Sequence, residues 1–209
     1  MATTTPNYGW DVPTSSDYVK LGAVAIETLG DDIDATLYNA LGGNYPGLRL
    51  VKKQVVGSAV SAVTVTSAFS ATYDNYKIVY SGGTCSVSSA DLRLTIGSSA
   101  TNYYGGLIFN RPNAATPSGI VNNNNTFWQY GGGLASSNGT ICSFELYAPF
   151  LTARTGLYSQ VIDLSGAGGA LGTFTGWHDS ATSHTSFTLT VGGATMTGGT
   201  IYVYGYGVS

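Results

Sequence analysis

Short stretches in which apolar and polar residues alternate fill the chain from about residue 48 to its end. In one of them, single polar residues separate Leu92, Leu94 and Ile96. Because successive side chains of a strand point to opposite faces of a sheet, this period of two predicts half-buried β-strands. The predicted strands cover residues 48–56, 60–66, 76–80, 90–96, 103–109, 126–130, 141–147, 157–164, 173–177, 186–191 and 200–206.

Glycine-rich turns separate these strands, and no helical pattern lies between them. Examples are Gly82–Gly83, Gly131–Gly133 and Gly192–Gly193. Helices between strands are typical of parallel sheets, whereas about ten strands joined by turns favour antiparallel pairing. The sequence therefore predicts a mainly β fold, an antiparallel jelly-roll-like β-sandwich over residues 43–209.

A different period precedes this region and predicts one amphipathic helix over residues 16–42. Thr14–Asp17 offer N-cap side chains, and Gly42–Gly43 end the pattern. Its apolar residues recur at spacings of three and four, close to a heptad, which favours a coiled coil that self-associates. Packing of the helix on its own domain is the alternative. The residues predicted to mediate oligomerisation are Val19, Ile26, Leu29, Ile33 and Leu37.

Residues 1–15 are polar, contain Pro6 and Pro13, and show no periodicity, so we expect an extended arm. Tyr8 and Trp10 are the aromatic residues of this segment and have no core of their own to enter. We expect them to dock the chain onto a neighbouring protein. A segment without fixed structure in the free protein is the alternative.

Charge is scarce and unevenly distributed. Only 9% of the 209 residues are charged, and the formal net charge is −3. With 8 Lys and Arg against 11 Asp and Glu, the chain lacks the basic surface that nucleic-acid binding needs. The longest apolar run is far shorter than the roughly 20 residues of a membrane span, and no signal-peptide pattern opens the sequence. Residues 1–42 are markedly acidic and residues 43–209 slightly basic, which places a domain boundary between them.

Amide, aromatic and arginine side chains cluster in parts of the β region. Amides and arginine form hydrogen bonds with sugar hydroxyls, and aromatic side chains supply rigid contact area with a polar tip. These residues therefore predict a surface that binds a host-cell glycan or protein, although the Trp side chains could instead belong to the core. The candidate receptor-binding residues are Tyr103, Tyr104, Asn110, Arg111, Asn123, Asn124, Trp128, Tyr130 and Trp177.

Patterns that carry enzyme chemistry are weak. No Gly-x-Ser-x-Gly motif and no phosphate-binding loop is present, and the few carboxylates of the β region form no recognisable pair. His178 and His184 are expected in a solvated turn, where a metal site would need a third ligand from elsewhere. Cys85 and Cys142 are expected to be buried thiols, although a disulfide between them remains open. We expect no enzyme activity, no metal and no cofactor.

Two parts of the sequence resemble bacteriophage structural proteins. Residues 5–14 (TPNYGWDVPT) and 19–34 resemble the N-termini of many tail-associated proteins, and residues 69–80 and 196–206 resemble the β domain that follows. The resemblance implies a tail fibre or tail-tip subunit of the virion, assembled in the host cytoplasm. It also implies a homotrimer that attaches to other virion proteins through its arm. A capsid head-fibre or decoration protein and a polysaccharide-degrading spike are the alternatives.

Overall fold

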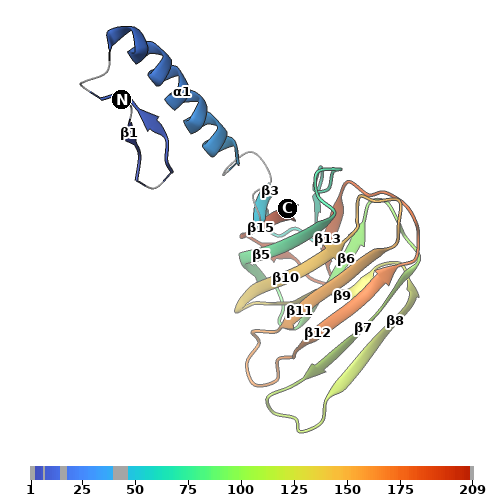
Figure 1. Ribbon diagram of the computed structural model, residues 1–209. Coiled ribbons are helices and arrows are strands. Elements are labelled where there is room, and N and C mark those ends of the chain that lie inside the picture. Colours follow the sequence, from blue (N-terminus) through green and yellow to red (C-terminus); the bar gives the residue numbers. More distant parts are fainter. Residues whose placement is uncertain (1–2, 7, 15–17, 40–46, 208–209) are drawn as a thin grey trace. The chain divides into compact units, whose positions relative to one another are not determined.

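The computed structural model of the chain describes residues 3–6, 8–14, 18–39 and 47–207. It divides into two compact units, Met1–Gly47 with Gly207–Ser209, and Leu48–Tyr206. We call them the N-terminal unit and the β unit. Among the described residues, the N-terminal unit holds the helix and two very short strands, and the β unit holds all other strands (Figure 1).

A short hairpin opens the N-terminal unit. Strands β1 (Thr3–Thr4) and β2 (Asp11–Val12) pair antiparallel, and the backbone N–H of Thr5 donates to the carbonyl oxygen of Trp10 at 2.9 Å. Gly9 has a φ of +68°, a conformation that glycine adopts at little cost. The prediction of an extended arm is therefore wrong for the described part of residues 1–15, because the chain turns back on itself.

The two aromatic residues of the hairpin differ in their surroundings. Their rings stack, with centroids 5.1 Å apart. Trp10 is half-buried, and its Nε1–H donates to Thr36 Oγ1 of the helix at 3.2 Å, whereas Tyr8 is 68% exposed. Trp10 is thus engaged within its own unit, and Tyr8 is the one that faces solvent.

The predicted helix is present as α1 (Val19–Leu37), inside the predicted range 16–42. Positions 15–17 and 42–43, where we expected its ends, lie outside the described residues, as does the side chain of Val19. Leu29 and Ile33 are half-buried, whereas Ile26 is 64% and Leu37 50% exposed. Apolar side chains therefore remain on the surface of this unit, and self-association of the helix stays a prediction.

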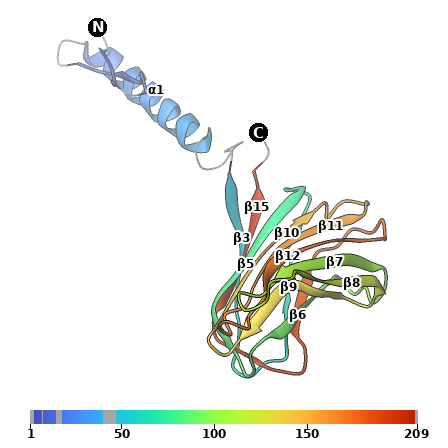
Figure 2. The ribbon, with the colours of Figure 1, turned by 90° about the horizontal axis from the view of Figure 1, so that it is seen from below.

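The β unit consists of two rows of antiparallel strands that meet at β9 and β10 (Figures 1 and 2). The long row runs β3 (Leu48–Val55), β15 (Thr200–Tyr206), β5 (Asn75–Cys85), β10 (Gly139–Tyr147), β11 (Thr155–Ile162), β12 (Leu171–His178), β7 (Tyr103–Asn110), β8 (Ser118–Asn125). The short row runs β4 (Ala62–Val65), β13 (Phe187–Val191), β6 (Ala90–Ile96), β9 (Trp128–Ser136). The two-residue strand β14 (Met196–Thr197) pairs with β5.

Apolar side chains from both rows meet in one core. The ring of Phe144 on β10 lies 5.9 Å from that of Phe187 on β13, edge to face. Leu92, Leu94 and Ile96 are fully buried, as their alternation predicted. The mainly β, antiparallel prediction is confirmed, whereas the connectivity does not confirm a jelly roll.

The two cysteines lie in this core as free thiols. Cys85 and Cys142 are both buried. Burial raises the pKa of the Cys142 thiol, because the thiolate is poorly solvated in an apolar surrounding. Both residues therefore act as small apolar side chains, which was the preferred interpretation of the sequence.

Strand β8 was not predicted, because its run of asparagines has no apolar alternation. It nevertheless pairs along most of its length with β7, for example Asn122 with Gly105. The backbone hydrogen bonds of a strand depend on its neighbour and not on its side chains, so β7 supplies what the sequence of β8 does not indicate. This strand forms one end of the long row and contributes to the site described below.

A glycine in β12 allows close approach to β7. Gly172 pairs with Phe109, and a Cβ at position 172 would overlap the carbonyl oxygen of Ile108. We expect Gly172→Ala to lower the free energy of unfolding by about 1–3 kcal/mol, because the strands must separate. Urea denaturation would measure this. Gly119→Ala is the control, since its Cβ would lie 3.6 Å from the nearest atom. Equal stability of the two variants would contradict the prediction.

Candidate binding site

The outer face of the long row contains a groove where β7, β8 and β12 lie side by side. Its volume is about 350 Å³, and we call it the aromatic groove. It is lined by Tyr104–Gly106 of β7, Val121–Asn123 of β8, and Thr175 and Trp177 of β12. No Lys, Arg, Asp, Glu or His side chain is among these residues, so the groove favours an uncharged ligand.

Two stacked aromatic side chains form one side of the groove. Trp177 and Tyr104 are paired across β12 and β7, their ring centroids are 5.4 Å apart, and their planes differ by 10°. Trp177 is 48% exposed, which is unusual for so large an apolar side chain. The pair therefore offers a rigid, solvent-facing aromatic surface with little conformational entropy to lose on binding.

Asn122 of β8 pairs with Gly105, so its side chain points to the inner face of the sheet, away from Trp177 and Tyr104. Its side chain is 2% exposed, and its Oδ1 accepts from the backbone N–H of Gln129 at 2.6 Å. The Nδ2 amide has no hydrogen-bond partner among the described residues. The amide that faces the groove is instead that of Asn123, which is exposed and lines it. The sequence pointed to Asn123 and Asn124 within this run, but nothing in it distinguishes Asn122.

Two of the predicted receptor-binding residues, Tyr103 and Trp128, are wrong as contact residues, because both are fully buried. Their rings pack edge to face at 4.9 Å. The Nε1–H of Trp128 donates to the carbonyl oxygen of Tyr104 at 3.0 Å, and the hydroxyl of Tyr103 donates to the carbonyl oxygen of Ser99 at 3.1 Å. They support the strand that carries Tyr104 and do not contact a ligand.

The other candidates divide between the groove and the opposite end of β7. Asn123 lines the groove with Tyr104 and Trp177. Asn124 is exposed, and its Oδ1 accepts from the backbone N–H of Asn102 at 3.1 Å. The remaining candidates lie beyond the groove, Asn110 at the far end of β7 and Arg111 and Tyr130 at a separate cavity of about 70 Å³.

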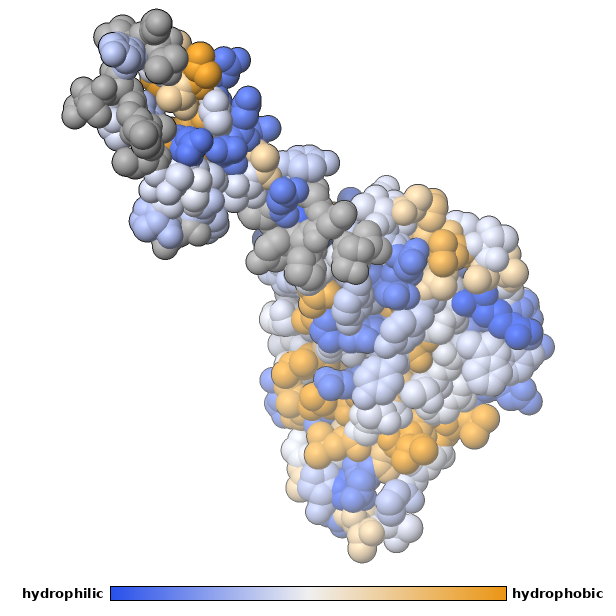
Figure 3. Space-filling view, in the orientation of Figure 1, coloured by the Kyte–Doolittle hydropathy of each residue, from blue (hydrophilic) through white to orange (hydrophobic). Residues whose placement is uncertain are grey.

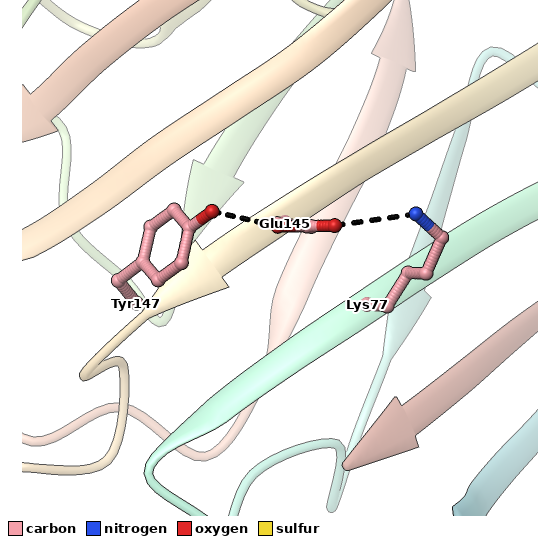
Figure 4. Close-up of polar contacts among 3 residues, drawn as sticks. All are labelled: Lys77, Glu145 and Tyr147. Atoms are coloured by element: carbon pink, nitrogen blue, oxygen red, sulfur yellow. Dashed lines mark hydrogen bonds and ion pairs between the residues drawn. The ribbon is translucent and has the colours of Figure 1, made fainter. Parts of the chain in front are cut away.

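A polar cluster lies near the middle of the same outer face. Figure 4 shows Glu145 of β10 between Lys77 of β5 and Tyr147. The hydroxyl of Tyr147 donates to Oε2 at 2.6 Å, and Nζ of Lys77 donates to Oε1 at 3.2 Å. Figure 3 shows one side of the β unit as mostly weakly polar, with separate apolar patches and separate strongly hydrophilic ones. The cluster is a fixed hydrogen-bonding point on the outer face.

The hydrogen bonds of this cluster decide how its groups ionise. Burial raises the pKa of Glu145, but hydrogen bonds from Tyr147, Tyr206 and Lys77 outweigh it, and the net effect lowers the pKa from 4.5. The bond to Glu145 is the largest of the effects that raise the pKa of Tyr147 to about 12. At neutral pH the carboxylate is ionised and both tyrosines donate hydrogen bonds, so Glu145 is not poised to give up a proton as a general acid.

The lowered pKa of Glu145 makes its contribution to stability depend on pH. We expect Glu145→Gln to lower the free energy of unfolding by about 0.5–1 kcal/mol at pH 7, a modest value because Lys77 and Glu145 are partly exposed to solvent. The difference is complete above pH 4.5 and is lost as the pH falls through the lower pKa of the folded state. Urea denaturation at several pH values would measure it, with exposed Asp74→Asn as control. A difference independent of pH would contradict this cause.

The burial of the two histidines contradicts what the sequence predicts for them. His178 and His184 are 1% and 6% exposed, so the expectation of a solvated turn is wrong. The expectation assumed that the polar segment between them faces water, but the imidazole rings turn inward beneath it. Among the residues that the structure describes, no three His, Cys, Asp or Glu side chains form a group that could hold a metal ion.

Comparisons with protein-family models, curated proteins and solved structures find no match for this chain. No helix in the described parts of the chain is long and apolar enough to cross a membrane.

Proposed function

We propose that the protein is a non-enzymatic virion subunit, of the tail-fibre or tail-tip class, that contributes to attachment to the host surface through the aromatic groove. The observation that carries this proposal is an exposed, uncharged groove that combines stacked Trp177 and Tyr104 with the exposed amide of Asn123. The resemblance of the N-terminal and C-terminal segments to phage tail proteins supports the virion setting.

The chemistry of the groove favours a neutral glycan over an acidic one. Aromatic faces stack on the C–H groups of a pyranose ring, and an amide N–H donates to a sugar oxygen. Val121 is 79% exposed at the rim and adds apolar contact. A host surface protein is the other partner that such a groove could accept.

The N-terminal unit supports a role in assembly. Ile26 and Leu37 leave apolar surface uncovered on α1, which suits association with copies of the same helix. We propose a homotrimer, the oligomeric state that the resemblance implies, with Tyr8 exposed for contact with another virion protein.

Oligomerisation has a direct test in solution. We expect the protein to have about three times the chain mass of 21.6 kDa by light scattering coupled to gel filtration. The double variant Ile26→Asp with Leu37→Asp is expected to dissociate to monomer, because carboxylates cannot be buried between helices without partners. Glu27→Gln, at a neighbouring exposed position, serves as control. An unchanged mass of the double variant would contradict the role of α1.

The position of the protein in the virion and its role in attachment are tested separately. Gold-labelled antibody against the protein should mark the tail end of purified virions, while label on the capsid would favour the head-fibre or decoration alternative. Purified full-length protein should compete with virions for adsorption to host cells. Failure to compete would contradict a role in attachment, and release of oligosaccharides from host capsule would instead favour a polysaccharide-degrading spike.

A further inference from the structure

His178 and His184, the only histidines of the chain, lie side by side in the interior at one end of the β unit. Their imidazole rings are 5.4 Å apart. Residues 97–99, which follow β6, and residues 178–186, most of them between β12 and β13, line a hydroxyl-rich cavity of about 610 Å³ there. Because a buried imidazole is costly to charge, the structure of this end depends on whether the two rings are neutral.

The hydrogen bonds of His178 define its neutral form. Its Nε2 lies 3.2 Å from the carbonyl oxygen of Thr101 and 2.7 Å from Oγ of Ser99. A carbonyl oxygen only accepts, so this contact assigns the proton to Nε2 and the lone pair to Nδ1. Nδ1 is buried and has no hydrogen-bond partner among the described residues. A proton added to Nδ1 would therefore create a buried cation with an unpaired N–H group.

His184 is equally unprepared to carry a charge. Its Nε2 is buried without a hydrogen-bond partner in the described part of the chain. Its backbone N–H donates to the carbonyl oxygen of Pro149 at 2.8 Å, and a Cβ on Gly97 would lie 2.6 Å from its Nδ1. The ring is thus packed closely against the backbone of residue 97, and a charge on it would be repelled by a charge on His178.

The strands packed against the pair bring only uncharged groups. The rings of Tyr103 on β7 and Trp128 on β9 lie 4.7 and 6.3 Å from that of His178, and Thr155 of β11 pairs with His178 in the sheet. Burial raises the pKa of Tyr103 from 10, so its hydroxyl stays neutral in acid and at neutral pH. Apart from the pair itself, the cavity is lined by Gly, Ser and Thr residues.

Asp179, which follows His178 directly, is the charged residue that acts on the pair. Burial lowers the pKa of His178 from 6.5 and outweighs the hydrogen bond to Thr101 and the Asp179 carboxylate, which raise it. Burial and then the neighbouring His178 lower the pKa of His184. Oδ1 of Asp179 in turn accepts a hydrogen bond from Nε of Arg154, so the carboxylate is engaged in an ion pair. Both imidazoles are therefore neutral at pH 7.

The pair lies on the inner face of the strands whose outer face carries the aromatic groove. Along β12, Trp177 and His178 are consecutive and point to opposite faces, as do Tyr103 and Tyr104 along β7. Strand pairing places His178 opposite Tyr103 on the inner face and Trp177 opposite Tyr104 on the outer face. Movement of the His178 ring would therefore displace the strand ends that hold the stacked pair.

We propose that His178 and His184 form an acid-sensitive switch that opens residues 179–186 and loosens the ends of β7 and β12 beneath the aromatic groove. In the open form the imidazolium groups reach water, so the closed form binds fewer protons and its stability rises with pH. That stability is complete above about pH 6.5 and is lost as the pH falls toward the lower pKa of the closed form. The stabilising effect of Glu145 disappears only below pH 4.5, a separate range.

Hydrogen–deuterium exchange of the full-length, untagged protein at pH 7.5 and pH 5.5 tests the switch. After correction for the intrinsic effect of pH on exchange, protection of residues 97–103 and 176–186 should fall by up to about tenfold for each histidine, the ratio given by an open-state pKa of 6.5. Peptides from β5 and β15 should keep their protection. The double variant His178→Gln with His184→Gln should lose this pH dependence, and exposed Asp74→Asn should retain it.

Two exchange results would overturn the proposal, namely equal protection at both pH values, or the same pH dependence in the native protein and the double variant. If the double variant does not fold, nuclear magnetic resonance of the native protein decides the question. Its two histidines are the only ones in the chain, so their Cε1–H signals report both pKa values directly. Values below 6.5 for both support the switch, and a value at or above 6.5 for either overturns it.

The effect of the switch on attachment rests on the proposed function and is measured separately. Binding of labelled native protein to host cells should weaken at pH 5.5 relative to pH 7.5, whereas the double variant should bind equally at both. Absence of binding at pH 7.5 would contradict the role in attachment, while the exchange result still decides on the switch. Equal weakening in both proteins would assign the pH effect to the host surface and overturn the link to the groove.

Discussion

Replacement of Trp128 by alanine is expected to lower the free energy of unfolding by about 3–5 kcal/mol, the usual effect of removing a large buried aromatic side chain. Trp128 is fully buried, packs against Tyr103, and donates a hydrogen bond to the backbone of β7. The variant loses this packing and leaves the Tyr104 carbonyl oxygen without its donor. Urea denaturation followed by circular dichroism would measure the change.

Trp177→Ala is the matched control for this experiment. Trp177 is about half exposed, and its main contact is the stack with Tyr104. Its removal should lower the free energy of unfolding by only about 0.5–1.5 kcal/mol, the value of an aromatic pair. If the Trp128→Ala and Trp177→Ala proteins were equally stable, Trp128 would not have the structural role described here.

The same Trp177→Ala variant is expected to weaken binding to the host surface by about 10–100-fold, as loss of an aromatic hot-spot residue does. It removes the exposed half of the stacked pair that forms one side of the aromatic groove. Binding of fluorescently labelled protein to host cells, measured by flow cytometry over a concentration series, gives the affinity.

Tyr158→Ala serves as control for that measurement. Tyr158 lies on β11 with 38% of its surface exposed, and it is not among the residues that line the groove. Its removal should leave binding unchanged. Equal loss in both variants would indicate general adhesion by the tyrosine-rich face, and no loss in either would remove the groove from the proposed function.

The period of two in the sequence predicted most strands but could not decide which face of each strand points to the core. In β7, Tyr103 and Leu107 share one face and Tyr104 and Ile108 the other, and both faces look apolar in the sequence. The structure buries the first face because the short row covers it. That choice depends on contacts between distant segments. The sequence alone therefore could not show that Tyr103 points into the core and Tyr104 away from it.

The groove, too, could not be predicted without knowledge of the fold. Trp177 and Tyr104 are far apart in the chain and meet only because β12 pairs with β7. Asn123 joins them through β8, a strand whose composition gave no indication of its structure. Residue types alone indicated the chemistry of a binding surface, and strand pairing determined which of those residues lie together.

The hairpin of the N-terminal unit was missed for a related reason. Strands of two residues are too short to show a period, and Gly9 was the main local indication of a turn. The polar neighbours of the two histidines predict a solvated turn. The burial of the histidines depends on the loop at residues 97–101, which lies far away in the sequence.

Strand β12 shows how such a protein could change its target over time. Phe174 and His178 point inward, while Thr175 and Trp177 point outward into the groove. Substitutions at the outward positions alter the ligand-facing surface and leave the packing of the core intact. Variants with new binding preferences would therefore melt at nearly the same temperature as their parent, so a lineage could explore many ligands without first acquiring stabilising substitutions.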